Sequence, residues 1–207
     1  MKKPLLVGHC LLLMLLLSFA AVPSTHAQAT WSAWLHNKTE ARMTLVGAEG
    51  MIDEFILPLP AGFDVYPDQV AVAPDGLHMA YIASQSTTAA QQLVVYDHTL
   101  RAIVATYDPA TAGGVVSGFP AFSPNSQRVA FGYSLAEGWE IINIDLPTFS
   151  IADALRYDDP AVQGIGLPTP PPPGLAPSIQ GYRDNLIAFV YTPLGMDDTS
   201  YQWQLDT

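Results

Sequence analysis

Cysteine is almost missing from this 207-residue sequence. Its one cysteine, Cys10, lies in an apolar N-terminal segment, so residues 30–207 contain none. Disulfides therefore cannot hold that part of the chain together, whatever the redox state of its compartment. A packed hydrophobic core has to do so, and a chain of this length is long enough to bury one.

Basic residues are also scarce, with 8 lysines and arginines against 19 aspartates and glutamates. Only six of the basic residues follow residue 29, whereas all 19 acidic residues do, so that part carries a formal charge of −13. Nucleic acid and anionic lipid headgroups repel such a chain. The sequence therefore predicts no nucleic-acid partner, and no membrane contact beyond its N-terminus.

The N-terminus has the order of a secretory signal peptide. Two lysines come first, an almost wholly apolar run covers residues 5–22, and small residues follow. We expect residues 1–29 to be the signal peptide, with cleavage after Ala27 or Ala29 and a secreted or periplasmic product. The alternative is an uncleaved leader that anchors the chain, because about 18 apolar residues are the short limit for crossing a bilayer.

One short block, an alanine followed by an aromatic residue, recurs four times in the rest of the chain. The alanines are separated by 47, 50 and 58 residues. Because the blocks repeat in register, we expect their aromatic side chains to be core residues. The four blocks are Ser32-Ala33-Trp34-Leu35, Met79-Ala80-Tyr81-Ile82, Val129-Ala130-Phe131-Gly132 and Ile187-Ala188-Phe189-Val190.

The same tight turn precedes two of these blocks. Ala73-Pro74-Asp75-Gly76 and Ser123-Pro124-Asn125-Ser126 lie 50 residues apart, and Tyr182-Arg183-Asp184-Asn185 is a third copy without the proline. Proline presets φ for the first corner of a turn, and Asp, Asn and Gly accept the next corners. The runs before the turns that can form strands are Gln69–Ala73, Gly118–Ser123 and Pro177–Gly181.

Another strand follows each block and ends in aspartate. Val94–Asp97, Ile142–Asp145 and Trp203–Asp206 align, with apolar residues one and three positions before the aspartate. This alternation is typical of a half-buried strand. We expect the recurring aspartates to cap turns. Val46–Glu49 takes this place in the first repeat, and the last strands of the repeats are Ile52–Leu59, Arg101–Tyr107 and Phe149–Leu155.

Four short antiparallel strands in a unit of about 50 residues are typical of a β-propeller blade. The sequence therefore predicts an all-β protein, a β-propeller of four-stranded antiparallel blades, and a β-sandwich is the competing fold. The approximate repeats are 30–66, 67–115, 116–167 and 175–207, and a proline-rich loop covers residues 168–174.

The first repeat lacks its first strand and the last lacks its fourth, which leaves 14 strands, or about 3.5 blades. Propellers usually close with about 4 to 8 blades. We therefore expect an incomplete propeller, either the N-terminal part of a longer one or a truncated reading frame. A closed four-bladed ring is the alternative, and an incomplete ring would favour self-association because it exposes strand edges and an apolar face.

Two segments resemble a known repeat family. Ala73–Tyr81 is similar to the S-P-D-G-x-x-(I/V)-A-F block of TolB-like repeats, also called WD40-like or PD40 repeats, and Ser123–Phe131 is closer still. Ile142–Asp145 resembles the strand that ends the family's blade. The resemblance implies a binding role, since TolB-like propellers act as interaction platforms in bacterial envelopes. It says little about a site, because the matching residues form turns and core.

Related blades also stand in front of the hydrolase domain of prolyl-oligopeptidase-like serine peptidases. This sequence contains no G-x-S-x-G motif, the signature of the nucleophile in that domain. We therefore expect a non-catalytic, exported platform for a protein or small ligand, without a cofactor. The alternative is the propeller portion of a larger enzyme whose catalytic domain lies outside this chain.

The remaining candidate site residues also have ordinary explanations. His36, His78 and His98 have no metal-ligand spacing, and we expect surface or strand roles for them. Asp158-Asp159 and Asp197-Asp198 are acidic pairs. The segment 195–200 around the second pair lacks the pattern of a calcium loop and is expected to be a solvated turn. Glu137, Glu140 and Asp145 could be paired carboxylates for glycoside hydrolysis, although carboxylates at neighbouring strand ends are common.

Each of three other features could have a functional role or an ordinary explanation. Trp139, in a predicted hairpin at residues 136–139, could line a binding surface or pack on a neighbouring blade. Pro168–Pro173 would be extended, as a docking motif or as a stiff loop between blades. Asn37-Lys38-Thr39 matches an N-glycosylation acceptor, which matters only in a host that glycosylates exported proteins.

Overall fold

The computed structural model describes residues 31–109, 114–116, 119–136, 138–159, 177–191 and 199–205. These ranges form fifteen β-strands. They contain no helix that is long and apolar enough to cross a membrane. The predicted leader, the proline-rich loop, Glu137, Asp197-Asp198 and Asp206 lie outside the described residues.

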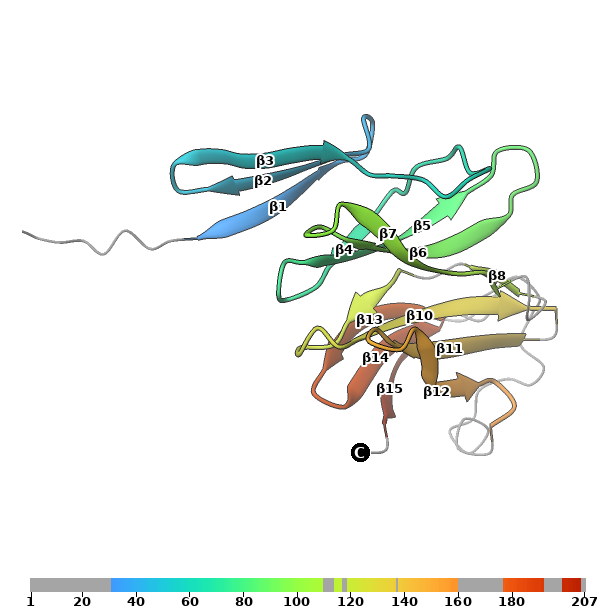
Figure 1. Cartoon of the computed structure of the whole chain (residues 1–207). Helices are drawn as coiled ribbons and strands as arrows, with labels where there is room; N and C mark the ends of the chain where they lie inside the picture. The colour runs from blue at the N-terminus through green and yellow to red at the C-terminus, as the bar shows by residue number, and fades with distance from the viewer. Residues whose placement is uncertain are drawn as a thin grey trace, which may run out of the picture.

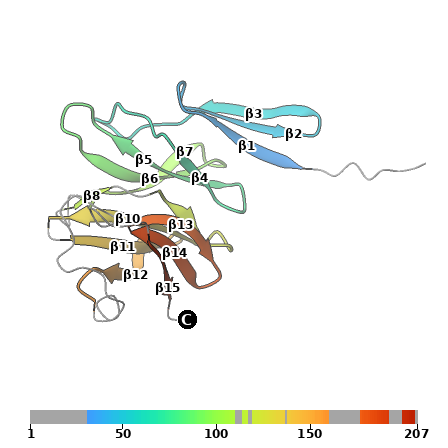
Figure 2. The ribbon, with the colours of Figure 1, turned by 180° about the vertical axis from the view of Figure 1, so that it is seen from behind.

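The strands form four antiparallel sheets, here called blades 1 to 4, stacked one after another (Figures 1 and 2). Blade 1 contains β1 (Ser32–Asn37), β2 (Arg42–Gly47) and β3 (Gly50–Ile56), and blade 2 contains β4 (Val70–Val72), β5 (His78–Ser84), β6 (Gln91–Asp97) and β7 (Ala102–Tyr107). Blade 3 contains β8 (Gly114–Val116), β9 (Ala121–Phe122), β10 (Arg128–Leu135), β11 (Gly138–Asp145) and β12 (Ser150–Arg156). Blade 4 contains β13 (Ser178–Arg183), β14 (Leu186–Tyr191) and β15 (Thr199–Gln204).

One β-bulge recurs at the same place in three blades, and it fixes which residues are equivalent. Each bulge lies between the last two strands of the blade, two residues before the inner strand ends. An extra residue here bends the outer strand and increases its twist. The extra residues are Ile52, Val104 and Ala152, and the cross-strand pairs just before the bulge are Leu45–Asp53, Val95–Ala105 and Asn143–Asp153.

The repeated bulge and strand order confirm the predicted propeller fold, with a three-stranded blade at each end. Among the described residues, blade 1 contains no counterpart of the predicted missing first strand, and blade 4 contains no fourth strand. Blade 3 has one strand more than predicted. Both β8 and β9 pair with β10, so the described residues contain fifteen strands instead of 14.

Three hydrophobic clusters hold the blades together, each between two neighbours. Met43 of blade 1 packs in one cluster with Tyr81 and Tyr96 of blade 2. The other two clusters join blades 2 and 3, and blades 3 and 4. Because side chains alternate along a strand, every inner blade faces its predecessor with one set of residues and its successor with the other. Each fully buried large side chain contributes roughly 1.5–3 kcal/mol of transfer free energy.

Three of the four predicted core aromatics are buried, and the fourth was placed wrongly. Tyr81 and Phe131 are completely buried, and Phe189 is nearly so. In blade 1 the strand pairing makes Leu35, not Trp34, the equivalent of Tyr81. Trp34 instead faces blade 2 and is half-buried against it. A one-residue error in the alignment assigns every side chain of a strand to the opposite face. No described sheet precedes blade 1, so no neighbouring blade covers the face of Leu35.

The predicted alignment of the last repeat is wrong by two residues. Leu186 pairs with Gln204, as His78 pairs with Asp97 in blade 2. Gln204, and not Asp206, is therefore the equivalent of Asp97. A shift of two residues leaves the alternation of inward and outward side chains unchanged, so the hydrophobic pattern could not detect it.

Candidate binding surfaces

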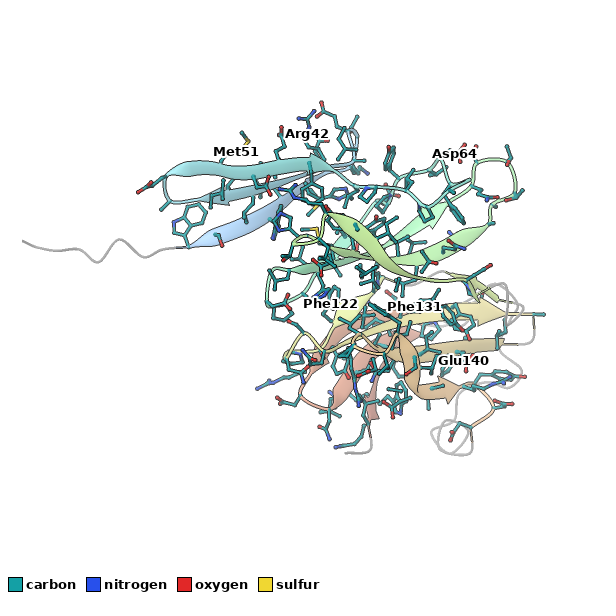
Figure 3. All side chains as sticks on the ribbon, viewed as in Figure 1. Arg42, Met51, Asp64, Phe122, Phe131 and Glu140 are labelled. Atoms are coloured by element: carbon teal, nitrogen blue, oxygen red, sulfur yellow. The ribbon has the colours of Figure 1, made fainter. Side chains whose placement is uncertain are left out.

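The outer face of blade 1 carries exposed apolar side chains. Leu35, Met51 and Ile56 are 54–67% exposed. Tyr81, the equivalent of Leu35 in blade 2, is completely buried because blade 1 covers it. The described part of the chain has no sheet that covers blade 1 in the same way. Figure 3 shows Met51 on the side of blade 1 that points away from the other blades.

An ion pair lies among these apolar residues on the same face. The Arg42 guanidinium donates to Glu54 Oε2 at 2.7 Å and to Glu40 Oε2 at 3.0 Å. Arg42 projects from the same side of blade 1 as Met51 (Figure 3). The hydrogen bond to Glu54 raises the pKa of Arg42 above its usual value. The face, here called the blade-1 face, is therefore apolar around Arg42 and its two carboxylate partners.

A polar cluster joins blades 1 and 2. Asp53 on β3 contacts His98 Nε2 and accepts a hydrogen bond from Arg101, both at 2.6 Å and both from blade 2. Arg101 also lies over the Phe55 ring, 5.4 Å from its centroid, a cation–π geometry. The hydrogen bonds from Arg101 and then His98 lower the pKa of Asp53 to about 2. These contacts make Asp53 an interblade anchor.

A second polar cluster joins blades 3 and 4. Asp153 accepts hydrogen bonds from Arg128 at 3.0 Å and from Asn143 Nδ2 at 3.1 Å. The same nitrogen of Asn143 donates to the Tyr182 hydroxyl of blade 4 at 3.1 Å. Burial raises the pKa of Tyr182. Asn143 is completely buried, and its Oδ1 has no hydrogen-bond partner among the described residues.

The predicted histidines take structural positions. His78 lies between Asp75 and Asp97, at 3.4 and 3.7 Å, and His98 belongs to the Asp53 cluster. Burial lowers the pKa of His36, whose Nε2 has no partner in the described ranges. Those ranges contain no group of three or more His, Cys, Asp or Glu side chains able to hold a metal ion.

Of the suggested glycosidase carboxylates, the structure describes Glu140 and Asp145, and it does not bring these two together. Glu140 accepts a hydrogen bond from the Tyr133 hydroxyl on the neighbouring strand. Asp145 lies five residues further along β11, about 16 Å away at the usual rise per residue of a strand. Paired catalytic carboxylates lie about 5–9.5 Å apart. The two residues therefore do not form such a pair.

The turn-capping prediction is confirmed for the two aspartates that the structure describes. Asp97 Oδ1 accepts from the Leu100 amide at 2.9 Å, and Asp145 Oδ2 accepts from the Thr148 amide at 3.2 Å. The suggestion that Trp139 lines a binding surface is wrong. Trp139 is the second residue of β11, is 1% exposed and packs in the cluster between blades 3 and 4. Asp158 is exposed and lies 3.4 Å from Arg156.

Sequence reasoning missed Asp53, Asp153 and Asn143, the residues that organise the two polar clusters. One signal was present, since the two aspartates are 100 residues apart, close to twice the repeat length. The predicted strand Ile142–Asp145 needs apolar residues only at positions 142 and 144, so its alternation allows a polar residue at position 143. Asn143 is buried at the contact with blade 4, where it donates to the Tyr182 hydroxyl.

Comparisons with known proteins bear on the fold alone. No family model matches the sequence, and no curated protein does. Many solved structures match in fold. TolB from Acinetobacter baumannii is 16% identical over 96% of this chain and 44% of its own, with a TM-score of 0.48. The RRP9 WD40 repeats are 12% identical over 77% and 41%, with a TM-score of 0.47.

This chain has a β-propeller fold. The β-propeller domain of the Trilobed protease from Pyrococcus furiosus is also similar, at 14% identity over 69% of this chain and 45% of that one, with a TM-score of 0.37. The chain thus spans less than half the length of each of these three structures.

Proposed function

We propose that this protein is an exported, non-catalytic binding platform and that the blade-1 face is its docking surface. One observation carries the proposal. Leu35 is 54% exposed at a position where Tyr81 and Phe131 of the inner blades are completely buried. Exposed apolar side chains gathered on one sheet are typical of interaction sites. The polar clusters of the described residues join blades to each other, which supports a structural and not a catalytic role for them.

The occupant that fits this face best is a second copy of the chain. A two-fold axis would place two identical sheet faces against each other, which is the commonest arrangement of homodimers. Arg42 and Glu54 lie side by side on the face, 2.7 Å apart. In a two-fold dimer each Arg42 can reach the Glu54 of the other copy, so the charged pair keeps its partners when it is buried. The contact would also cover Met51 and Ile56.

The test is sedimentation velocity on the purified exported chain at concentrations from about 1 to 100 µM. We expect a concentration-dependent dimer, and we expect Leu35→Asp to shift the protein to monomer because it buries an unpaired charge. Leu100→Asp is the matched control, because Leu100 is 66% exposed on a turn of blade 2. A chain that stays monomeric throughout this range, or a dimer that Leu35→Asp leaves intact, would contradict the proposal.

A further inference from the structure

A pocket of about 240 Å³ opens between blades 3 and 4. Blade 2 lies between these two blades and blade 1 in the stack (Figure 1). The pocket lies beside the turns that lead into β10 and β14. Polar groups from both blades line it, together with one leucine. The lining residues are Ser123, Asn125, Arg128, Tyr182, Asp184, Asn185 and Leu205.

The pocket exists because the turn of blade 4 is short. Phe122 pairs with Val129 across the turn of blade 3, so six residues lie between them. Tyr182 takes the place of Phe122 in blade 4 and pairs with Ile187, so only four residues lie between them. Between blades 2 and 3 the longer turns touch, and the Asp75 amide donates to Ser126 Oγ at 2.9 Å. The shorter turn of blade 4 does not fill the corresponding space beside the turn of blade 3, and this space is the pocket.

Hydrogen-bond donors line the blade-3 side of the pocket. Asn125 Oδ1 accepts from the Gln127 amide at 3.1 Å and from Ser123 Oγ at 2.7 Å. These bonds orient the Asn125 side chain and leave its Nδ2 without a partner among the described residues. Arg128 has five N–H groups, and the bond to Asp153 uses its NH1 group.

Acceptors line the opposite side of the pocket, on blade 4. Asn185 Nδ2 donates to the Leu205 carbonyl at 3.4 Å, so its Oδ1 is the atom left to accept. Asp184 adds a carboxylate at the rim. The Tyr182 hydroxyl of blade 4 accepts from Asn143 and retains its own hydrogen, so it adds one donor to this side.

Asn143 of blade 3 is completely buried behind Tyr182, and its Oδ1 has no partner among the described residues.

The charges that line the pocket are already compensated. Asp153 lies 3.0 Å from Arg128, and Arg183 lies 3.9 Å from Asp184. An ionic ligand would therefore find no uncompensated opposite charge. A hydroxyl group both donates and accepts, so a ligand with several hydroxyls satisfies both sides at once. At 240 Å³ the volume lies below the roughly 300 Å³ at which pockets for drug-sized ligands begin.

We propose that this pocket binds a neutral polyhydroxylated ligand the size of one hexose ring. Ring hydroxyls would accept from Asn125 Nδ2 and Arg128 and donate to Asn185 Oδ1, with the ring against Tyr182 and Leu205. This site is separate from the blade-1 face, so either proposal can fail while the other stands.

The test is a titration of the isotopically labelled exported chain with D-glucose and with myo-inositol, followed by ¹H–¹⁵N correlation spectra. Concentrations reach about 50 mM, since a ligand of this size is expected to bind with a millimolar Kd. We expect saturable shifts of the Asn125 and Asn185 side-chain amides. Acetate and glycine serve as the anionic and zwitterionic probes, and we expect neither to shift these amides.

Asn125→Asp is the decisive variant. It keeps the oxygen that accepts in the turn, and blade 2 carries Asp75 at the same position with the same contact, Leu77 N to Oδ1 at 2.8 Å. It replaces the donor with an acceptor, so we expect about a tenfold weaker affinity for the polyol. Asn37→Asp is the control, because Asn37 Oδ1 also caps an exposed turn, that of Thr39 in blade 1.

Three results would overturn the proposal. They are the absence of saturable shifts with both polyols at 50 mM, shifts with acetate or glycine alone, and an affinity that Asn125→Asp leaves unchanged.

Discussion

Asp53 and Asp153 occupy the same position in blades 1 and 3, directly after the extra residue of the bulge, and each accepts a hydrogen bond from an arginine. Asp53 reaches Arg101 in the next blade directly. Asp153 reaches the next blade through Asn143, which donates to both Asp153 and Tyr182. The same strand position thus contributes polar contacts to two of the three interfaces between neighbouring blades, here called blade seams. Blade 2 has Ala105 there, and its seam with blade 3 carries the hydrogen bond between Asp75 and Ser126 instead.

Replacing Asp53 should weaken the seam between blades 1 and 2 at neutral pH. The pKa of Asp53 is lowered to about 2 in the folded protein, against about 3.9 in an unfolded chain. Its stabilising effect is therefore complete above about pH 4 and is lost as the pH falls towards 2. Because the side chain is 23% exposed, we expect Asp53→Asn to cost only about 1 kcal/mol. Urea unfolding at pH 6 and at pH 2.5 measures this.

The pH dependence is the decisive part of this prediction. The wild type and Asp53→Asn should differ in unfolding free energy at pH 6, and the difference should become smaller at pH 2.5, close to the lowered pKa of Asp53. A difference that persists unchanged at pH 2.5 would mean that the carboxylate is not responsible. Glu40→Gln is the control, since Glu40 is an exposed carboxylate on blade 1 that contacts no other blade in the described structure.

Gly132 should tolerate no side chain, because blade 4 lies directly against it. A Cβ at this position would come within 2.4 Å of the Pro177 carbonyl oxygen, a backbone atom. We expect Gly132→Ala to destabilise the protein by about 1–3 kcal/mol, the usual cost of overpacking. Gly181→Ala is the matched control, because a Cβ there meets nothing within 4 Å. Equal thermal unfolding temperatures for the two variants would refute this packing of blades 3 and 4.

Ser126 has two roles that different substitutions separate. It has a φ of 58°, which glycine adopts at little cost, and its Oγ accepts from the Asp75 amide. Ser126→Gly loses only the hydrogen bond, whereas Ser126→Ala also keeps the backbone strain. We expect Ser126→Ala to be the less stable variant by about 0.5–1 kcal/mol in chemical denaturation. The opposite order would rule out the strained turn.

The predicted cleavage of the signal peptide can be measured directly. Mass analysis of the protein recovered from outside the cytoplasm should give an N-terminus at Gln28 or Thr30, after cleavage at Ala27 or Ala29. An intact Met1 in a membrane fraction would instead identify an uncleaved anchor.

The sequence predicted the blades because turn residues and strand alternation are local signals. It placed β5, β10 and β14 through the alanine–aromatic block. The prediction failed for residues whose burial depends on packing against a second sheet. The prediction assigned Trp34 and Leu35 to the wrong faces of their strand, because no described sheet precedes blade 1. Trp139 is buried because blade 4 packs against it. The polar clusters and the pocket combine residues from different blades, so no local pattern could reveal them.

The most direct test of the binding platform is the accessibility of residue 51 as a function of protein concentration. Residues 30–207 contain no cysteine, so Met51→Cys and the control Leu100→Cys each introduce one thiol into the exported chain. If the blade-1 face binds a second copy, maleimide will modify Cys at position 51 more slowly as the protein concentration rises, while the rate at position 100 stays constant. A rate at position 51 that does not change with concentration would contradict the account.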